Sequence, residues 1–305
     1  MIDKKSFIYT GPSWAYTAYE NVHDDINISN NDINLGNLLN KEFEYEMHWH
    51  PYIGGSNIWL HNNIKELSLD KKIPIIWVYC EPLASLHYNK EMNRQSFPFF
   101  RPQHRPFVEK FLTSSNWEEL RFDLADVDLK ILNEMGNPIG LIGSHSDILP
   151  EQVEKYENLT VLEPSWQFVI AKEVGITTGY RWGVDFAHQM IKVFLENSNI
   201  TNYLEDNKIE TPDKDEYGFA DSFGKIKYIP KSKGERLMKI IFNNFGYRHK
   251  SIDKKLVDVI DDTYNFWKLL EEKGIFTWVH TNIKGNKVFH KHIKTKVKKF
   301  IDDHA

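Results

Sequence analysis

Three short segments of the sequence place a serine, a pair of glycines and a histidine where acyl-transfer chemistry would use them. Ser13 follows a short β-prone run that ends at Gly11-Pro12, and an apolar spacing typical of a helix begins directly after it. A serine on a strand-to-helix turn is exposed at the sheet edge, where free N–H groups at the helix start can stabilise an oxyanion. The same position suits a helix N-cap, which is a common role for serine. Ser13 is therefore a candidate nucleophile or a cap.

The second segment is the turn Gly54-Gly55-Ser56-Asn57, which lies immediately before a predicted helix. Glycines let the backbone approach a ligand closely, and serine or asparagine can cap the helix or donate a hydrogen bond. We expect Gly55 to provide a second oxyanion donor and Asn57 to contact the substrate. An ordinary glycine-rich turn is the alternative interpretation.

The third segment contains His280, which precedes the last predicted helix. Thr281 or Asn282 could be the N-cap of that helix. A helix N-terminus disfavours the charged imidazolium, so it helps to keep a nearby histidine neutral and able to act as a base. The alternative is that His280 is simply one of the 13 histidines of the chain, at its surface.

In their order along the chain, these segments resemble the blocks of the GDSL/SGNH hydrolase superfamily. That family carries a catalytic serine just after its first strand, oxyanion donors in two later blocks, and an Asp-x-x-His block before its C-terminal helix. The matching segments here are Phe7-Ile8-Tyr9-Thr10-Gly11-Pro12-Ser13-Trp14, Gly54-Gly55-Ser56-Asn57, and the run from Thr277 to Asn286. The resemblance implies an esterase or O-deacetylase in which Ser13 forms an acyl-enzyme and His280 is the base. It implies no metal and no organic cofactor.

The sequence differs from the family pattern at three places. Pro12 stands where the family has aspartate, and Thr277 stands three residues before His280, where the catalytic aspartate is expected. The apolar run at 75–80 ends in Cys80-Glu81-Pro82 and is not followed by a Gly-x-Asn-Asp block. The alternative function is therefore a catalytically inactive protein of this fold that binds a carbohydrate, a nucleotide or a protein. A metal-dependent nucleotide or sugar transferase is a third hypothesis.

A fourth polar segment, Gly143-Ser144-His145-Ser146-Asp147, follows another predicted buried strand. His145 or Asp147 could bind the substrate or replace the missing acid. The alternative is a capped loop in which Asp147 starts the next helix.

The elements that must position these residues alternate between strands and helices. Continuous apolar runs at 75–80 and 139–142 are typical of central parallel strands covered on both faces. The pattern predicts an α/β fold, a three-layer α/β/α sandwich with a mainly parallel sheet. The resemblance implies that this sandwich is of the flavodoxin-like SGNH type. In such sheets ligands bind at the carboxyl ends of the strands, where the candidate residues follow them. We expect a single domain over 1–305, with a polar surface insertion at about 197–230.

Composition narrows the class of protein further. The 305 residues are 41% hydrophobic, enough for a sizeable core. Thirty-eight Lys and Arg against 43 Asp and Glu give a net charge of −5, which argues against a protein that wraps nucleic acid. The only cysteine, Cys80, cannot form an internal disulfide. We predict a cytoplasmic protein without a signal peptide or membrane span, with a small-molecule or glycan ester as substrate.

Two pairs of histidines look like metal ligands, at His48 and His50 and at His290 and His292. Residues two apart share one side only in a strand, and no third ligand is identifiable. We therefore expect no metal site. The lysines between 284 and 299 lie largely opposite an apolar stripe, so we interpret them as the solvated face of an amphipathic helix.

Overall fold

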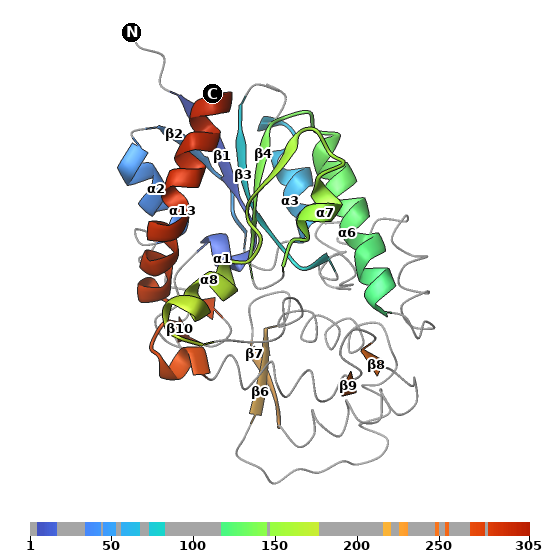
Figure 1. Cartoon of the computed structure of the whole chain (residues 1–305), viewed down its shortest axis with the longest axis vertical. Helices are drawn as coiled ribbons and strands as arrows, with labels where there is room; N and C mark the ends of the chain where they lie inside the picture. The colour runs from blue at the N-terminus through green and yellow to red at the C-terminus, as the bar shows by residue number, and fades with distance from the viewer. Residues whose placement is uncertain are drawn as a thin grey trace.

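The structure is a computed structural model of the chain, and a parallel sheet covered by helices forms its core (Figure 1). It describes residues 5–16, 34–43, 45–52, 56–67, 73–82, 117–144, 147–176, 216–220, 226–230, 248–249, 254–255, 269–277 and 280–305. In this part of the chain, no helix is long and apolar enough to cross a membrane.

The central sheet has five strands, and every neighbouring pair is parallel. The strands are β1 (Ser6–Thr10), β2 (Glu46–Trp49), β3 (Ile75–Tyr79), β4 (Ile139–Gly143) and β5 (Leu159–Glu163). Their order across the sheet is β2-β1-β3-β4-β5, which is the flavodoxin-like order. The predicted α/β class with a mainly parallel sheet is confirmed.

Strand β3 shows why continuous apolar runs form the middle of this sheet. All five of its residues are buried. Ile76 and Val78 contribute to one hydrophobic core, whereas Ile75 and Trp77 contribute to a second core on the opposite face. Since successive side chains of a strand point to opposite faces, a strand covered on both sides must be apolar at every position.

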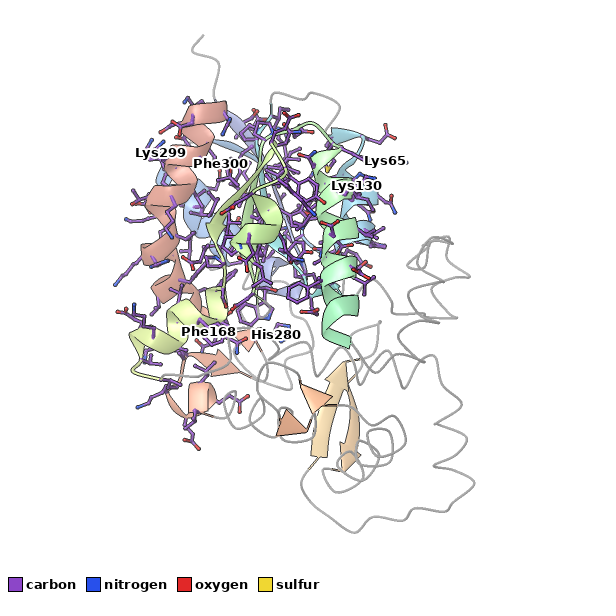
Figure 2. All side chains as sticks on the ribbon, turned by 45° about the vertical axis from the view of Figure 1, so that its right-hand side comes forward. Lys65, Lys130, Phe168, His280, Lys299 and Phe300 are labelled. Carbon is purple, nitrogen blue, oxygen red and sulfur yellow. The ribbon has the colours of Figure 1, made fainter. Side chains whose placement is uncertain are left out.

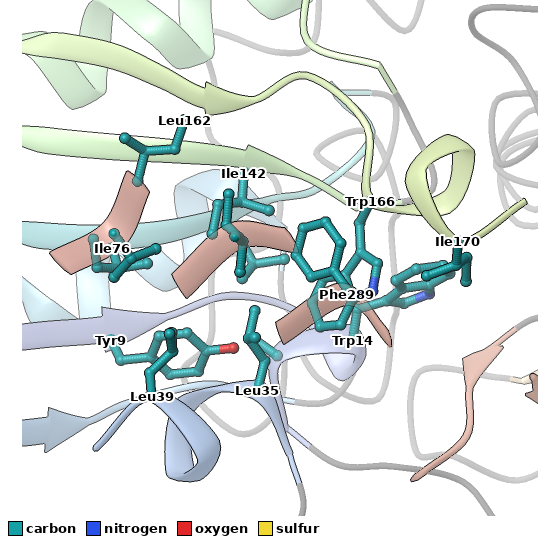
Figure 3. Close-up of a cluster of buried hydrophobic side chains, with 14 of the residues drawn as sticks. Tyr9, Trp14, Leu35, Leu39, Ile76, Ile142, Leu162, Trp166, Ile170 and Phe289 are labelled. Carbon is teal, nitrogen blue, oxygen red and sulfur yellow. The ribbon is translucent and has the colours of Figure 1, made fainter. Parts of the chain in front are cut away.

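One face of the sheet is covered mainly by the C-terminal helix (Figure 1). This layer consists of α1 (Ser13–Tyr16), α2 (Leu35–Phe43), α8 (Trp166–Glu173) and α13 (Ile283–His304). Helix α13 buries Phe289, Ile293 and Val297 completely against the sheet and its neighbours. Figure 3 shows the tightly packed end of this core, where Phe289 lies between Trp166 and the side chains of the strands. The apolar stripe predicted for the last helix is therefore its core-facing side.

The opposite face is covered by α3 (Asn57–Ile64), α6 (Trp117–Asn133) and α7 (Pro150–Val153) (Figure 1). Leu60 and Ile64 of α3 are fully buried there, and Leu129 of α6 is nearly so. With helices on both faces, the structure has the three layers that the sequence predicts.

Short antiparallel strand pairs complete the described elements. They are β6 (Glu216–Ala220) with β7 (Ile226–Pro230), β8 (Arg248–His249) with β9 (Lys254–Lys255), and β10 (Phe276–Thr277) with β11 (His280–Thr281). The pair β6–β7 falls within the predicted insertion at 197–230, and the rest of that segment lies outside the described residues. The single-domain organisation stays a prediction.

Candidate functional site

The topology of the sheet singles out the carboxyl ends of β1 and β3. β2 lies on one side of β1, while β3, β4 and β5 follow one another on the other side, so the direction of winding reverses between β1 and β3. In open parallel sheets this reversal opens a crevice, and ligands bind in it. The residues that follow these two strands are 11–13 and 80–82.

Ser13 is the first residue of α1, directly beyond the carboxyl end of β1. The chain makes this turn against β3, and only glycine fits at position 11. A Cβ atom on Gly11 would lie 2.6 Å from Cβ of Val78 and 2.7 Å from Cβ of Ala15. The N–H of Ala15 donates to the carbonyl of Pro12 at 2.9 Å, which closes the turn. The backbone of Ser13 is therefore fixed at the point where the winding reverses.

The segment that leads to the second glycine block lies beside this turn. Thr10 Oγ1 donates to the carbonyl of His50 at 2.9 Å, and the N–H of Tyr52 donates to the carbonyl of Gly11 at 2.9 Å. The β1–β2 ladder thus continues past the ends of both strands. Gly55 lies outside the described residues, but its neighbour Ser56 is the N-cap of α3 and accepts from the N–H of Trp59.

Asn57, expected to contact the substrate, has a structural role in the fold. Its Nδ2 donates to the carbonyl of Cys80 at 2.9 Å and to Asp128 Oδ2 at 2.8 Å. Its Oδ1 accepts from Trp77 Nε1 at 3.2 Å and from the N–H of Cys80 at 3.0 Å. These four bonds use both donors and both acceptor positions of the amide, and the residue is 1% exposed. Asn57 therefore ties the start of α3 to the end of β3 and to α6, with no capacity left for a substrate.

His280 lies at the same end of the sheet (Figure 2). It is 8% exposed, and its ring centroid lies 6.4 Å from that of Trp14, the residue after Ser13. In the β10–β11 pair its partner across the two strands is Thr277. The fold thus brings together Trp14 and His280, which the sequence separates by almost the whole chain.

A set of buried aromatic rings supports His280. Trp14 meets Trp166 edge to face, with centroids 5.5 Å apart, and Trp166 stacks on Phe289 at 4.3 Å. All three side chains are at most 1% exposed (Figure 3). Aromatic contacts of this geometry add to the stability of a core. The start of α1 is therefore packed against α8, which in turn packs against α13.

The start of α13 also fixes the position of the β10–β11 pair. Asn282 is the N-cap and accepts from the N–H of Gly285 at 3.0 Å, which selects Asn282 over Thr281 as the cap. A Cβ atom on Gly285 would lie 2.4 Å from the carbonyl oxygen of Ile275 and 2.5 Å from Cγ2 of Thr281. The glycine therefore permits the close approach of the helix to the strand pair that carries His280.

The loop after β4 lies on the other side of β3. Ser144 Oγ donates to the carbonyl of Tyr79 at 2.8 Å, so it joins the ends of the two strands. Asp147 is 8% exposed, and His145 lies outside the described residues. Glu81, which follows β3, is fully buried at this end of the sheet.

The histidine pair of α13 divides between two different partners. His290 Nε2 lies 3.1 Å from Glu42 Oε2, whereas His292 Nε2 lies 2.7 Å from Glu163 Oε2. Burial, as the largest effect, holds the pKa of His290 below its ordinary value. Within the described ranges, no group of three His, Cys, Asp or Glu residues is arranged to hold a metal ion.

Several lysines of α13 are paired with carboxylates on the solvent-exposed side of the helix. Lys294 lies 2.7 Å from Glu42, and Lys296 lies 3.0 Å from Glu163. These pairs connect α13 to α2 and to the end of β5.

Comparison with known proteins leaves the family of the chain open. No protein-family model matches the sequence, and no curated protein matches it. Among solved structures, the chain is similar to the protein YxiM of Bacillus subtilis, with 9% sequence identity and a TM-score of 0.37. The similarity covers 97% of this chain and 57% of that chain, so it spans little more than half of the relative's length. The function must therefore be argued from the site.

Proposed function

We propose that the protein is a serine hydrolase that cleaves esters, with Ser13 as nucleophile and His280 as base. One observation carries the proposal: the fold brings the strand pair of His280 against Trp14, immediately beside a serine at the reversal of the sheet. A nucleophile and a base must lie within reach of each other and of a ligand.

In this mechanism Ser13 Oγ attacks the carbonyl carbon of the ester while His280 takes the hydroxyl proton. The carbonyl oxygen becomes an oxyanion, and the backbone N–H groups of Ser13 and Gly55 stabilise it. The imidazolium then protonates the departing alcohol, which leaves an acyl group on Ser13. A water molecule, deprotonated by His280, releases the acid and restores the free serine.

The surroundings of His280 suit a base. Helix α13 begins at Ile283 with Asn282 as its cap, so its N-terminus lies directly after the β10–β11 pair. A helix N-terminus disfavours a positive charge nearby, which favours the neutral imidazole that accepts a proton.

The test compares Ser13→Ala with wild type on p-nitrophenyl acetate. We expect the variant to lose at least a hundredfold in kcat/KM, since removal of the nucleophile abolishes the acyl-enzyme. Ser6→Ala is the matched control, because Ser6 begins β1 and so lies at the end of that strand opposite to the turn that carries Ser13. Equal rates for wild type and Ser13→Ala would reject the hydrolase.

A second candidate function is ligand binding without catalysis, favoured by the threonine opposite His280. Residue 277 is paired directly with His280, and a carboxylate at this place would orient the imidazole and stabilise its charged form. A purely binding protein would leave Ser13 unlabelled by a fluorophosphonate probe. Labelling of Ser13, identified by mass spectrometry, would reject this candidate.

A further inference from the structure

The backbone of Tyr52, an exposed aromatic residue, lies beside the turn that carries Ser13. Tyr52 is 41% exposed, whereas Thr10 and Gly11 of the neighbouring segment are buried. Its N–H donates to the carbonyl of Gly11 at 2.9 Å, two residues before Ser13. Single exposed aromatic residues are common on protein surfaces, so the argument depends on this position.

The ring of Tyr52 is also held in place. It packs on Trp59 with the ring centroids 4.0 Å apart and the planes 38° apart. Trp59 is 6% exposed and belongs to the core between α3 and the sheet. One face of the tyrosine ring is thus supported by the fold while the residue remains accessible. A supported aromatic ring loses little conformational entropy on binding, which makes it an effective contact surface.

We propose that Tyr52 is a specificity-determining residue that stacks against a flat ring in the substrate. This inference rests on the proposed function, because it places the ring next to the ester that Ser13 attacks. Stacking on an aromatic side chain tolerates any ligand with a flat face, so the ring is either an aromatic group or the C–H face of a sugar. The two sources share one chemistry and are separated by the choice of substrate.

The experiment measures kcat/KM of wild type, Tyr52→Ala and Tyr52→Phe on three acetate esters. Phenyl acetate carries an aromatic ring, 6-O-acetylglucose carries a sugar ring, and hexyl acetate carries a flexible chain of six carbons. We expect Tyr52→Ala to lose about tenfold on at least one ring ester and less than twofold on hexyl acetate. Tyr52→Phe keeps the ring and should stay within threefold of wild type on all three. The ring ester that is affected identifies the source of the ring.

Leu67→Ala is the matched control, because Leu67 is also exposed, at 39%, but lies beyond the far end of α3. An equal loss on all three esters for Tyr52→Ala, or no loss on any, would overturn the inference while leaving the hydrolase intact. If no ester is hydrolysed, ligand-detected NMR with phenylacetone and glucose tests separately whether a ring stacks on Tyr52. The inference is supported if wild type binds one of the two ligands and Tyr52→Ala binds that ligand about tenfold more weakly. It is rejected if both proteins bind equally well or if neither ligand binds.

Discussion

At the scale of single residues, Asn57 shows how one amide can organise the end of a sheet. It joins Cys80 at the end of β3 to Asp128 of α6, and all three residues are at most 4% exposed. A buried amide with every hydrogen bond made stabilises a unique arrangement, whereas one missing partner leaves a costly unsatisfied group. The position of the start of α3 depends on this arrangement.

Replacement of Asn57 by aspartate should therefore destabilise the protein strongly. The change puts a carboxylate oxygen where Nδ2 now donates to Cys80 and Asp128. We expect a loss of roughly 3–5 kcal/mol, the range for an uncompensated buried charge. Urea denaturation followed by circular dichroism measures it.

The double variant Asn57→Asp/Asp128→Asn is the control for this pair. It returns an amide opposite a carboxylate, so it should recover part of the stability that Asn57→Asp loses. If the losses in free energy of unfolding of Asn57→Asp and Asp128→Asn simply add in the double variant, the hydrogen bond between the two side chains is not the cause of the destabilisation.

At the scale of elements, the β10–β11 pair determines what faces His280. The register places Thr277 directly across from it, and cross-strand partners have Cβ atoms about 4.5–5.5 Å apart. The close contact of Gly285 with Ile275 holds this pair against α13. An acid introduced at position 277 would thus stand beside the proposed base without any rearrangement of the helix.

We predict that Thr277→Asp raises the rate at which a fluorophosphonate labels Ser13, by about tenfold or more. A carboxylate beside an imidazole stabilises the imidazolium that forms as the serine is deprotonated. Removal of the carboxylate from a complete triad slows catalysis by far more than tenfold, so a gain of tenfold is a modest expectation. Thr277→Asn has the same shape without the charge and should label at the wild-type rate. Identical rates for the three proteins would contradict the assignment of His280 as the base.

At the scale of the whole molecule, hydrogen bonds connect the C-terminal end of α13 to the residues that precede β1 and β2. Asp302 accepts from Lys5 at 3.0 Å, from Tyr45 at 2.6 Å and from Lys298 at 2.5 Å. These partners come from the start of β1, the start of β2 and the helix itself. The hydrogen bond from Lys298, together with those from Tyr45 and Lys5, holds the pKa of Asp302 well below its ordinary value.

The lowered pKa of Asp302 predicts how the contribution of these hydrogen bonds to stability depends on pH. A carboxyl whose pKa is lower in the folded state stabilises the fold fully above its ordinary pKa of about 4, and the effect disappears as pH falls toward the lowered value. Asp302→Asn should lower the urea midpoint slightly between pH 7 and pH 5, and the difference from wild type should shrink below about pH 4.

High salt provides the control for Asp302, because exposed ion pairs are screened by salt. In 1 M sodium chloride the difference between wild type and Asp302→Asn should be smaller at pH 7. A difference that stays constant from pH 7 to pH 2 would exclude ionisation of Asp302 as its cause.

The sequence alone determined the kind of elements and the fold class. The apolar runs that became β3 and β4, and the helical spacing that became α13, are local patterns whose periods are fixed by backbone geometry. They also made Ser13 and His280 the candidate nucleophile and base, because both stand at the ends of such elements.

Only the tertiary structure decided what these residues face. Asn57 meets Asp128, 71 positions away, and Tyr52 comes to rest beside Gly11, while the strand order puts the reversal next to Ser13. Contacts of this kind depend on how strands pair sideways and on how helices pack over them. Local sequence patterns do not determine the strand order, since the same pattern fits many strand orders.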